Sequence, residues 1–218
     1  MFETPKIPEK KQDLKIGINP QFQGFVPAEF SEDPFGYFET HGKNIKPGET
    51  VYEGEKIKED PTAVKDFPVW TDENGNELKV VAKRVNTEKG KVGKTANPFY
   101  EADVMEKVRE LGLPAPAPIA RIQKEDEFLI LMERAEGFTI FDPALQEIFQ
   151  EKGYSEKDKE ELKKDAEGAM AELQSRFEQA GVQRKWKLSD MVFQVDFSTK
   201  KITGITPVDW ERTEIIGS

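Results

Sequence analysis

Residues 201–211 read Lys-Ile-Thr-Gly-Ile-Thr-Pro-Val-Asp-Trp-Glu. The β-branched first half of this segment predicts a strand, and the acidic residue Asp209 follows where that strand ends. Carboxylates are the ligands that hard cations prefer, and a cation that bridges phosphates is commonly held by an aspartate in such a position. We therefore interpret Asp209 as a candidate metal ligand.

A hairpin and a long helix are predicted around this segment. Met191–Asp196 and Lys201–Val208 flank a polar turn, which favours two paired strands. Further upstream, Ser155 with Asp158 three residues later is typical of a helix start, and Gly181 is typical of a helix end. The apolar residues between these signals repeat at helical spacing and form one stripe: Leu162, Ala166, Ala169, Met170, Leu173, Phe177 and Ala180.

Two more hairpins are predicted in the middle of the chain. The dipeptide Asn74-Gly75 between the apolar segments Phe67–Thr71 and Leu78–Val85 is a strong turn signal. Ile119–Gln123 and Phe128–Met132 form the next pair of segments. The unbroken apolar run of the second segment is typical of a strand that is buried on both faces.

The rest of the first half contains one predicted helix and one irregular segment. The helix opens at Asn97-Pro98 and ends at Gly112, and Leu113–Pro118 is too rich in proline to continue it. Thr50–Lys58 is a further candidate strand. Residues 1–49 hold no regular period, so we expect an arm that packs on the body through its phenylalanines. These are Phe22, Phe25, Phe30, Phe35 and Phe38.

The order of elements is β, β, β, helix, β, β, helix or helices, β, β. This order predicts an α+β fold with antiparallel sheets and argues against a doubly wound α/β fold. We divide the chain into an irregular arm at 1–49, a unit of strands with one helix at 50–132, and a final unit at 133–218.

Composition excludes several classes of function. The net charge is −10, and so acidic a surface repels nucleic-acid phosphates and anionic lipids. The best basic run, residues 184–187, is too short to reverse this sign. The chain has no cysteine, which excludes disulfides, thiolate nucleophiles and cysteine-ligated zinc. Its single histidine, His41, lies in a polar segment without an identified partner, so serine–histidine hydrolase chemistry loses its usual base. Because no membrane-length apolar run or signal peptide is recognisable, we expect a cytoplasmic protein or one secreted without a cleaved signal peptide.

Lys83 follows the apolar run Val80-Val81-Ala82 and is a candidate phosphate ligand. An ammonium group that projects from a sheet suits phosphate oxygens, although a lysine there also serves as a gatekeeper of an edge strand. Glu101, in the first turn of the next helix, is placed to pair with Lys83, and Glu106 is the competing carboxylate. A helix-capping role would also explain Glu101 without any functional site.

The segment 132–137 reads Met-Glu-Arg-Ala-Glu-Gly and follows the buried strand. Its backbone groups are suited to hydrogen-bond a flat base held between two parts of the protein. An ordinary strand-to-helix connection has the same pattern, because the backbone would make these contacts whatever the side chains.

Taken in order, these segments resemble the protein-kinase-like superfamily, and above all its aminoglycoside and choline phosphotransferase branch. The residues that carry the resemblance are Val80–Lys83, Glu101–Met105, Leu111–Pro116, Phe128–Gly137, Ile202–Ile205 and Val208–Glu211. The resemblance implies a two-lobed fold with an antiparallel N-lobe sheet and an abbreviated helical C-lobe.

The resemblance also implies two cofactors, ATP and Mg²⁺, and a role for each site residue. Lys83 would contact the α- and β-phosphates, and Glu101 would pair with it. Met132, Glu133 and Arg134 would form the adenine hinge. Asp209 would bind Mg²⁺.

Asp190 has two alignments with the catalytic loop of that superfamily. At the asparagine position it is a second metal ligand, and no catalytic base remains. At the aspartate position it accepts the hydroxyl proton, and the asparagine is missing. The first alignment fits the predicted hairpin better, because the strand Met191–Asp196 must begin at once.

Two further departures from the superfamily pattern bear on function. No Gly-rich phosphate loop precedes Lys83, so residues 50–67 would have to cover the phosphates in an irregular way. The sequence stops nine residues after Asp209, as in minimal bacterial effector kinases.

The sequence leaves three functions open. One is a kinase that transfers phosphate from ATP to a protein partner, with Lys83, Glu101 and Asp190 as catalytic residues. Another is a pseudokinase that acts as a protein-interaction module. The third is an unrelated α+β binding protein.

Overall fold

The computed structural model of the protein describes residues 14–45, 64–86, 97–140, 142–210 and 212–216. The main sheet of this part is antiparallel throughout, which confirms the predicted α+β class. Its six strands, in spatial order, are β1 (Leu14–Ile18), β7 (Pro118–Lys124), β8 (Glu127–Glu133), β6 (Val80–Asn86), β3 (Val64–Asp66) and β2 (Lys43–Asn44).

Strand β8 lies inside this sheet and is buried on both faces, as its apolar run predicts. Phe128, Ile130 and Met132 point to one face and Leu129 and Leu131 to the other, because successive side chains of a strand alternate. The sheet therefore separates two hydrophobic cores. We call the core around Ile130 the inner core and the core around Leu131 the outer core.

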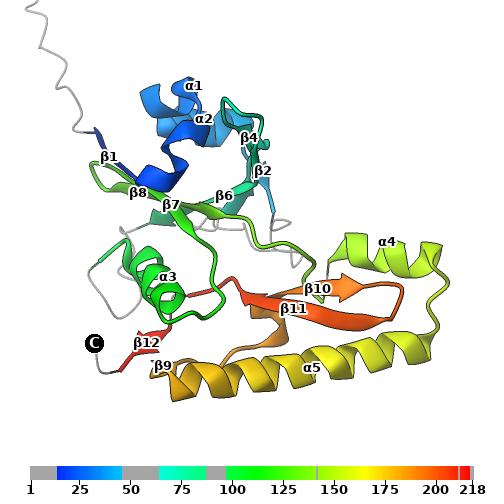
Figure 1. Ribbon diagram of the computed structural model, residues 1–218. Helices are drawn as coiled ribbons and strands as arrows, with labels where there is room; N and C mark the ends of the chain where they lie inside the picture. Colours follow the sequence, from blue (N-terminus) through cyan, green and yellow to red (C-terminus); the bar gives the residue numbers. More distant parts are fainter. Residues whose placement is uncertain (1–13, 46–63, 87–96, 141, 211, 217–218) are drawn as a thin grey trace, which may run out of the picture.

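Residues 14–45 differ from the irregular arm that the sequence predicts. They form β1 at the edge of the sheet, the 3-10 helix η1 (Pro20–Phe25), and the helices α1 (Ala28–Glu32) and α2 (Pro34–His41). Figure 1 shows α1 and α2 covering one face of the sheet. Strand β1 pairs with β7, which is distant in the chain, so local periodicity did not reveal it.

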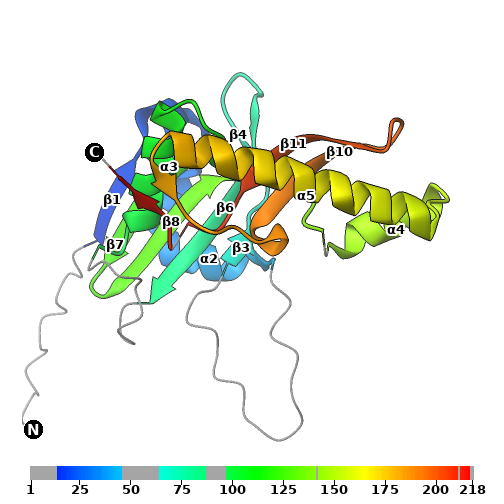
Figure 2. The ribbon, with the colours of Figure 1, turned by 90° about the horizontal axis from the view of Figure 1, so that it is seen from below.

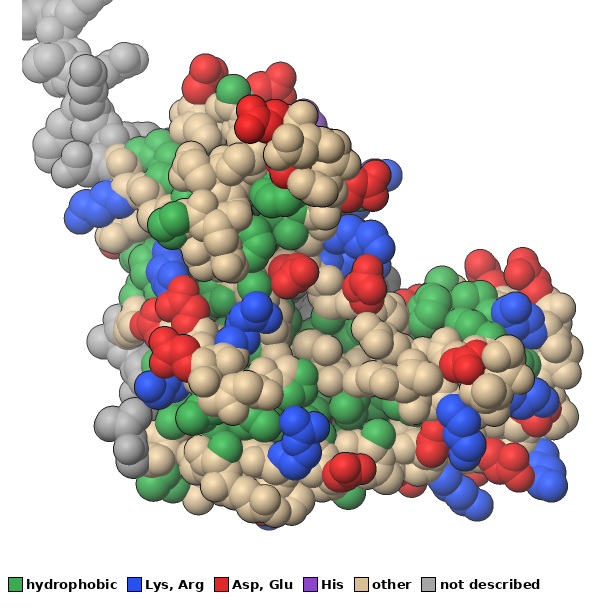
Figure 3. All heavy atoms as spheres, viewed as in Figure 1, with side chains coloured by type: hydrophobic (Ala, Val, Ile, Leu, Met, Phe, Trp, Pro, Cys, Tyr) green, Lys and Arg blue, Asp and Glu red, His purple; other side chains and the backbone are tan. Residues whose placement is uncertain are grey.

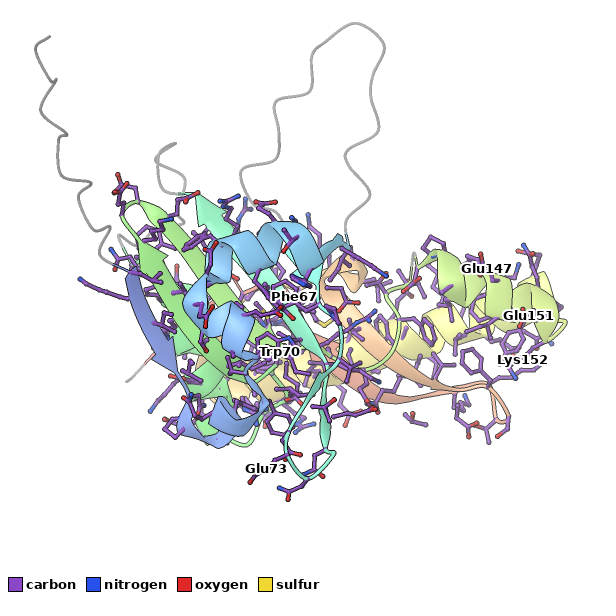
Figure 4. The ribbon with its side chains drawn as sticks, turned by 90° about the horizontal axis from the view of Figure 1, so that it is seen from above. Phe67, Trp70, Glu73, Glu147, Glu151 and Lys152 are labelled. Carbon is purple, nitrogen blue, oxygen red and sulfur yellow. The ribbon has the colours of Figure 1, made fainter. Side chains whose placement is uncertain are left out.

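The phenylalanines of this N-terminal segment pack on the body, as expected. Phe30 and Phe38 are fully buried in the outer core and contact Phe67, and Phe30 also contacts Trp70. Figure 4 shows Phe67 and Trp70 beside the N-terminal helices. The predicted Asn74-Gly75 turn then joins the short strands β4 (Trp70–Thr71) and β5 (Glu77–Leu78), with Glu73 at its projecting tip (Figure 4).

Helix α3 (Tyr100–Glu110) covers the opposite face of the sheet (Figure 1). Ala102, Met105 and Val108 project from it into the inner core, at intervals of three residues that are close to the helical repeat. Gly112 follows with a φ of 72°, a left-handed conformation that favours glycine and ends the helix where the sequence predicts.

The remaining elements form a C-terminal half. It contains the helices α4 (Pro143–Glu151) and α5 (Glu156–Gln179), the hairpin of β10 (Met191–Asp196) with β11 (Lys201–Pro207), and the 3-10 helix η2 (Leu188–Asp190). Strand β9 (Val182–Gln183) pairs with β12 (Glu214–Ile215), so the segments before and after the hairpin lie together. Figure 2 shows α5 crossing the β10–β11 hairpin. The predicted capping box of Ser155 and Asp158 begins α5.

The chain passes from the sheet to the C-terminal half through Gly137 and Phe138. The backbone N–H of Phe138 donates to the carbonyl oxygen of Phe193 at 2.9 Å, and the N–H of Phe193 donates back at 2.8 Å. Gly137 has a φ of 122°, and a Cβ atom at that position would lie 2.1 Å from the oxygen of Phe193. Only glycine fits this close approach of two backbones.

Charged side chains of both signs are interspersed on the face shown in Figure 3. They are dense at the far end of the molecule, where α4 meets the start of α5. Glu147, Glu151 and Lys152 lie on this end in Figure 4.

No helix in the described part of the chain is both long and apolar enough to cross a membrane. The predicted strand Thr50–Lys58 lies outside the described residues.

Acidification is expected to weaken the attachment of the β10–β11 turn to α5. Lys200 donates to the Asp158 carboxylate at 2.7 Å, and this hydrogen bond, together with those from Ser155, lowers the pKa of Asp158 from 3.8 to about 2. Because the pKa is lower in the folded state, the stabilisation is complete above pH 3.8 and is lost as the pH falls toward 2.

The measurement is the melting temperature of the wild type and of Asp158→Asn across that pH range. The variant should be less stable at neutral pH and should lose less stability on acidification. Hydrogen bonds from Ser198 and Thr199 also hold the pKa of Asp196 at about 2. The melting temperature of both proteins should therefore still fall somewhat as the pH approaches 2. Parallel curves for the two proteins would contradict the prediction.

Candidate functional site

Lys83 and Glu101 form an ion pair at the inner face of the sheet. Lys83 Nζ donates to Glu101 Oε1 at 2.5 Å, and the two side chains are only 12% and 11% exposed. Lys83 shares the inner face with Val81 and Val85 because it lies two residues from each in β6. The sheet and α3 thus hold an ammonium group in one position, as the sequence predicts.

The competing carboxylate has a different partner. Glu106 accepts two hydrogen bonds from the Arg121 guanidinium, at 3.0 and 2.8 Å, and Asp103 accepts a third at 2.9 Å. These contacts attach α3 to β7. Glu101 is therefore the residue of α3 that pairs with Lys83.

Asp209 lies between β11 and β12 and is positioned by its neighbours in the chain. Trp210 is fully buried, packs edge-on against Trp186 with ring centroids 5.0 Å apart, and donates through Nε1 to the carbonyl of Pro207 at 3.2 Å. The N–H of Val208 donates to the carbonyl of Asp190 at 2.9 Å. These contacts hold the backbone around Asp209, whose side chain is 45% exposed.

Asp190 and Asp209 meet at the guanidinium group of Arg184. Arg184 Nη2 lies 2.9 Å from Asp209 Oδ2 and 3.5 Å from Asp190 Oδ2, and Nη1 lies 3.4 Å from Asp209 Oδ1. Asp190 also accepts hydrogen bonds from the backbone N–H of Lys187 and the hydroxyl of Ser189, each at 3.1 Å. The two predicted metal ligands are therefore brought together.

The Lys83 pair and the Asp209 segment belong to the same layer of the molecule. Trp210 lies in the inner core with Val81 and Ala102, the neighbours of Lys83 and Glu101. In addition, the hydroxyl of Tyr100 donates to the carbonyl of Thr213 at 2.7 Å, which joins the first turn of α3 to the segment that follows Asp209. Lys83, Glu101 and Asp209 are thus all near neighbours in the chain of residues that pack in the inner core.

The segment Met132–Arg134 is engaged with neighbouring backbone. Met132 is buried in the inner core. The N–H of Glu133 donates to the carbonyl of Ala117 at 2.8 Å, and the N–H of Arg134 donates to the carbonyl of Lys79 at 2.9 Å. The N–H groups of Glu133 and Arg134 are therefore already used within the protein, and an adenine ring at this segment would need other backbone groups.

Arg184 is the site residue that sequence reasoning missed. It lies in the basic run 184–187, which we considered only for its effect on the overall charge. Its side chain is 7% exposed and its Cζ atom lies 4.6 Å from the centre of the Trp186 ring. The available signal was an arginine two residues before a tryptophan, because arginine commonly stacks on the face of an indole ring.

Asp190 and Asp209 suit a divalent cation that is shared with phosphate groups. Mg²⁺ commonly binds one or two carboxylates and takes its other ligands from substrate phosphates and water. Both carboxylates lie within 3.5 Å of one nitrogen atom, so they converge on one place. Within the described ranges, no cluster of three or more His, Cys, Asp or Glu side chains could hold a metal ion by itself.

A surface hollow of about 510 Å³ lies elsewhere, between the segment after α3, the helix α5 and strand β11. Its lining includes Leu113, Leu173, Arg176 and Ile205, and none of the predicted site residues. This hollow is therefore separate from the candidate site.

Comparison with known proteins does not assign this chain to a family. No protein-family model matches the chain, and no curated protein matches it. Function therefore has to be inferred from the arrangement of the side chains.

Proposed function

We propose that the protein is a kinase-like domain that binds ATP with Mg²⁺ and transfers phosphate to a protein partner. The sheet with α3 would be the N-lobe, and the C-terminal half would be the C-lobe. The single observation that carries this proposal is the buried pair of Lys83 and Glu101 beside the inner core, which also contains Trp210, the residue after Asp209. An ammonium group fixed by a carboxylate is suited to triphosphate oxygens, since phosphoryl transfer depends mainly on positioning and charge.

Each polar residue has a distinct task in this proposal. Lys83 would bind the α- and β-phosphates, and Glu101 would keep its ammonium group in place. Asp209 and Asp190 would hold Mg²⁺, which neutralises charge on the phosphates when bound. The proposed acceptor of the phosphate is a protein partner.

The second candidate is a pseudokinase, and the position of Asp190 favours it. Asp190 directly precedes β10, as required by the alignment in which it replaces the asparagine and serves as a metal ligand. Residues 184–189 contain no carboxylate that could act as the base. Positioning and charge neutralisation alone would still support slow transfer by the first candidate, so the two candidates share the nucleotide site and differ in whether phosphate is transferred.

The proposal predicts that ATP with Mg²⁺ raises the melting temperature of the wild type. Lys83→Ala and Asp209→Asn should abolish this shift, because they remove the phosphate ligand and a metal ligand. A matched control is Lys107→Ala, which removes a lysine of α3 that is 44% exposed and pairs with Glu110. The control should keep the full shift. An ATP shift that persists in Lys83→Ala and Asp209→Asn would contradict the proposed site.

Incorporation of labelled phosphate from ATP separates the two candidates. Transfer to the protein itself or to proteins of a lysate, absent in Lys83→Ala, would support the kinase. Nucleotide binding without transfer would support the pseudokinase. No effect of ATP on any variant would favour an unrelated α+β binding protein.

A further inference from the structure

We propose that Arg184 is a positioning residue that holds the Asp190 and Asp209 carboxylates together without a cation and must release Asp209 before a divalent cation can bind. This inference rests on the proposed function, because it concerns the same two carboxylates. The observation behind it is that one buried guanidinium group contacts both of them.

Electrostatics explains why the two carboxylates need a cation between them. Like charges that converge in a partly buried place repel each other, and a guanidinium group removes this repulsion while donating hydrogen bonds. The Trp186 ring, 4.6 Å from Arg184 Cζ, adds a cation–π contact. Arg184 therefore supplies the kind of charge neutralisation that a metal ion also provides.

The same geometry makes the guanidinium group and a divalent cation competitors. Mg²⁺ binds carboxylate oxygens at about 2.0–2.1 Å, and a second cation hydrogen-bonded to the same oxygens would be repelled by it. Arg184 Nη2 already lies 2.9 Å from Asp209 Oδ2. The cation can use this oxygen only after the Arg184–Asp209 contact opens.

The structure indicates which carboxylate moves. Asp190 is 15% exposed and is held by the Lys187 N–H and the Ser189 hydroxyl in addition to Arg184. Asp209 is 45% exposed and lies between two strands. Asp209 is the more exposed of the two carboxylates, so it is the one that a cation from solvent reaches first and that exchanges Arg184 for it.

The consequence is that Arg184 lowers the affinity of the site for a divalent cation alone. Two carboxylates without their guanidinium partner would attract the cation more strongly. A nucleotide adds phosphate ligands and would make the exchange favourable, so metal and nucleotide should bind together better than either binds alone.

The test measures binding of Mn²⁺ alone, by calorimetry, to the wild type, Arg184→Gln and Arg184→Lys. Arg184→Gln should bind Mn²⁺ more tightly by on the order of tenfold, while Arg184→Lys, which keeps the charge, should resemble the wild type. The gain should disappear in the double variant Arg184→Gln with Asp190→Asn. Equal or weaker binding of Mn²⁺ by a folded Arg184→Gln variant would overturn the proposal.

A second measurement uses the native side chains and does not depend on folding of Arg184→Gln. Addition of Mg²⁺ with ATP to the wild type should change the tryptophan fluorescence, because the guanidinium group over Trp186 shifts when its contact with Asp209 opens. Trp186→Phe should lose this change. If ATP and Mg²⁺ stabilise the wild type but leave Trp186 emission unaltered, the release of Arg184 is wrong and the nucleotide site stands. If neither ligand stabilises any variant, the proposed function itself fails.

Discussion

Replacement of Gly137 by alanine is expected to lower the free energy of unfolding by about 3 kcal/mol or more. The alanine Cβ would lie 2.1 Å from the carbonyl oxygen of Phe193 and 2.6 Å from its carbonyl carbon. Both are backbone atoms, so no side chain can rotate away. The φ of 122° adds conformational strain for any L-residue with a side chain.

The strain falls on the contact that joins the sheet to the C-terminal half. To accept the methyl group, the Phe138–Phe193 bridge has to open, which removes two hydrogen bonds between the segment after β8 and strand β10. The measurement is urea unfolding followed by circular dichroism. A nucleotide-dependent stabilisation, if present in the wild type, should weaken in parallel.

A matched control is available in α5. Gly168 lies in the interior of this helix, and a Cβ atom added there would meet no heavy atom of another element within 4 Å. Gly168→Ala should therefore raise stability by roughly 0.5–1 kcal/mol, because alanine has the higher helix propensity. Similar unfolding midpoints for the two alanine variants would show that the Gly137 contact does not constrain the fold.

The second large effect is expected at the ion pair of Lys83 and Glu101. Loss of one partner of a buried ion pair is typically destabilising by about 3–5 kcal/mol. We expect Lys83→Met and Glu101→Leu each to lose about 3 kcal/mol, the low end of this range, because both side chains keep slight exposure. The double variant should lose much less than the sum of the two.

A double-mutant cycle measures this coupling without any nucleotide. The control cycle uses Lys107 and Glu110, a pair on α3 with a 3.1 Å contact and side chains 44% and 66% exposed. Exposed pairs of this kind contribute about 0–1 kcal/mol. A coupling between Lys83 and Glu101 no larger than that of the control pair would remove the reason for treating their contact as the centre of the site.

Several elements could be predicted from local sequence because their causes are local. The Ser155 capping box, the Asn74-Gly75 turn and the buried strand of the apolar run Phe128–Met132 depend on residues a few positions apart. The sequence also predicted that Lys83 pairs with a carboxylate of the next helix, with Glu101 and Glu106 as the two candidates. The structure pairs Lys83 with Glu101 and gives Glu106 a different partner, Arg121.

Tertiary structure alone decided the remainder. The edge strand β1 is held by backbone hydrogen bonds to β7. Almost every residue type has the same backbone N–H and C=O groups, so the sequence does not reveal this pairing. The contact of Arg184 with Asp190 and Asp209 needs β9, η2 and the end of β11 to meet, and a charge run carries no information about which carboxylates it will face. The amino-acid pattern by itself determined most of the secondary structure and the residue types of the site, because these follow from nearest neighbours. Which charges touch was decided by packing between segments far apart in the chain.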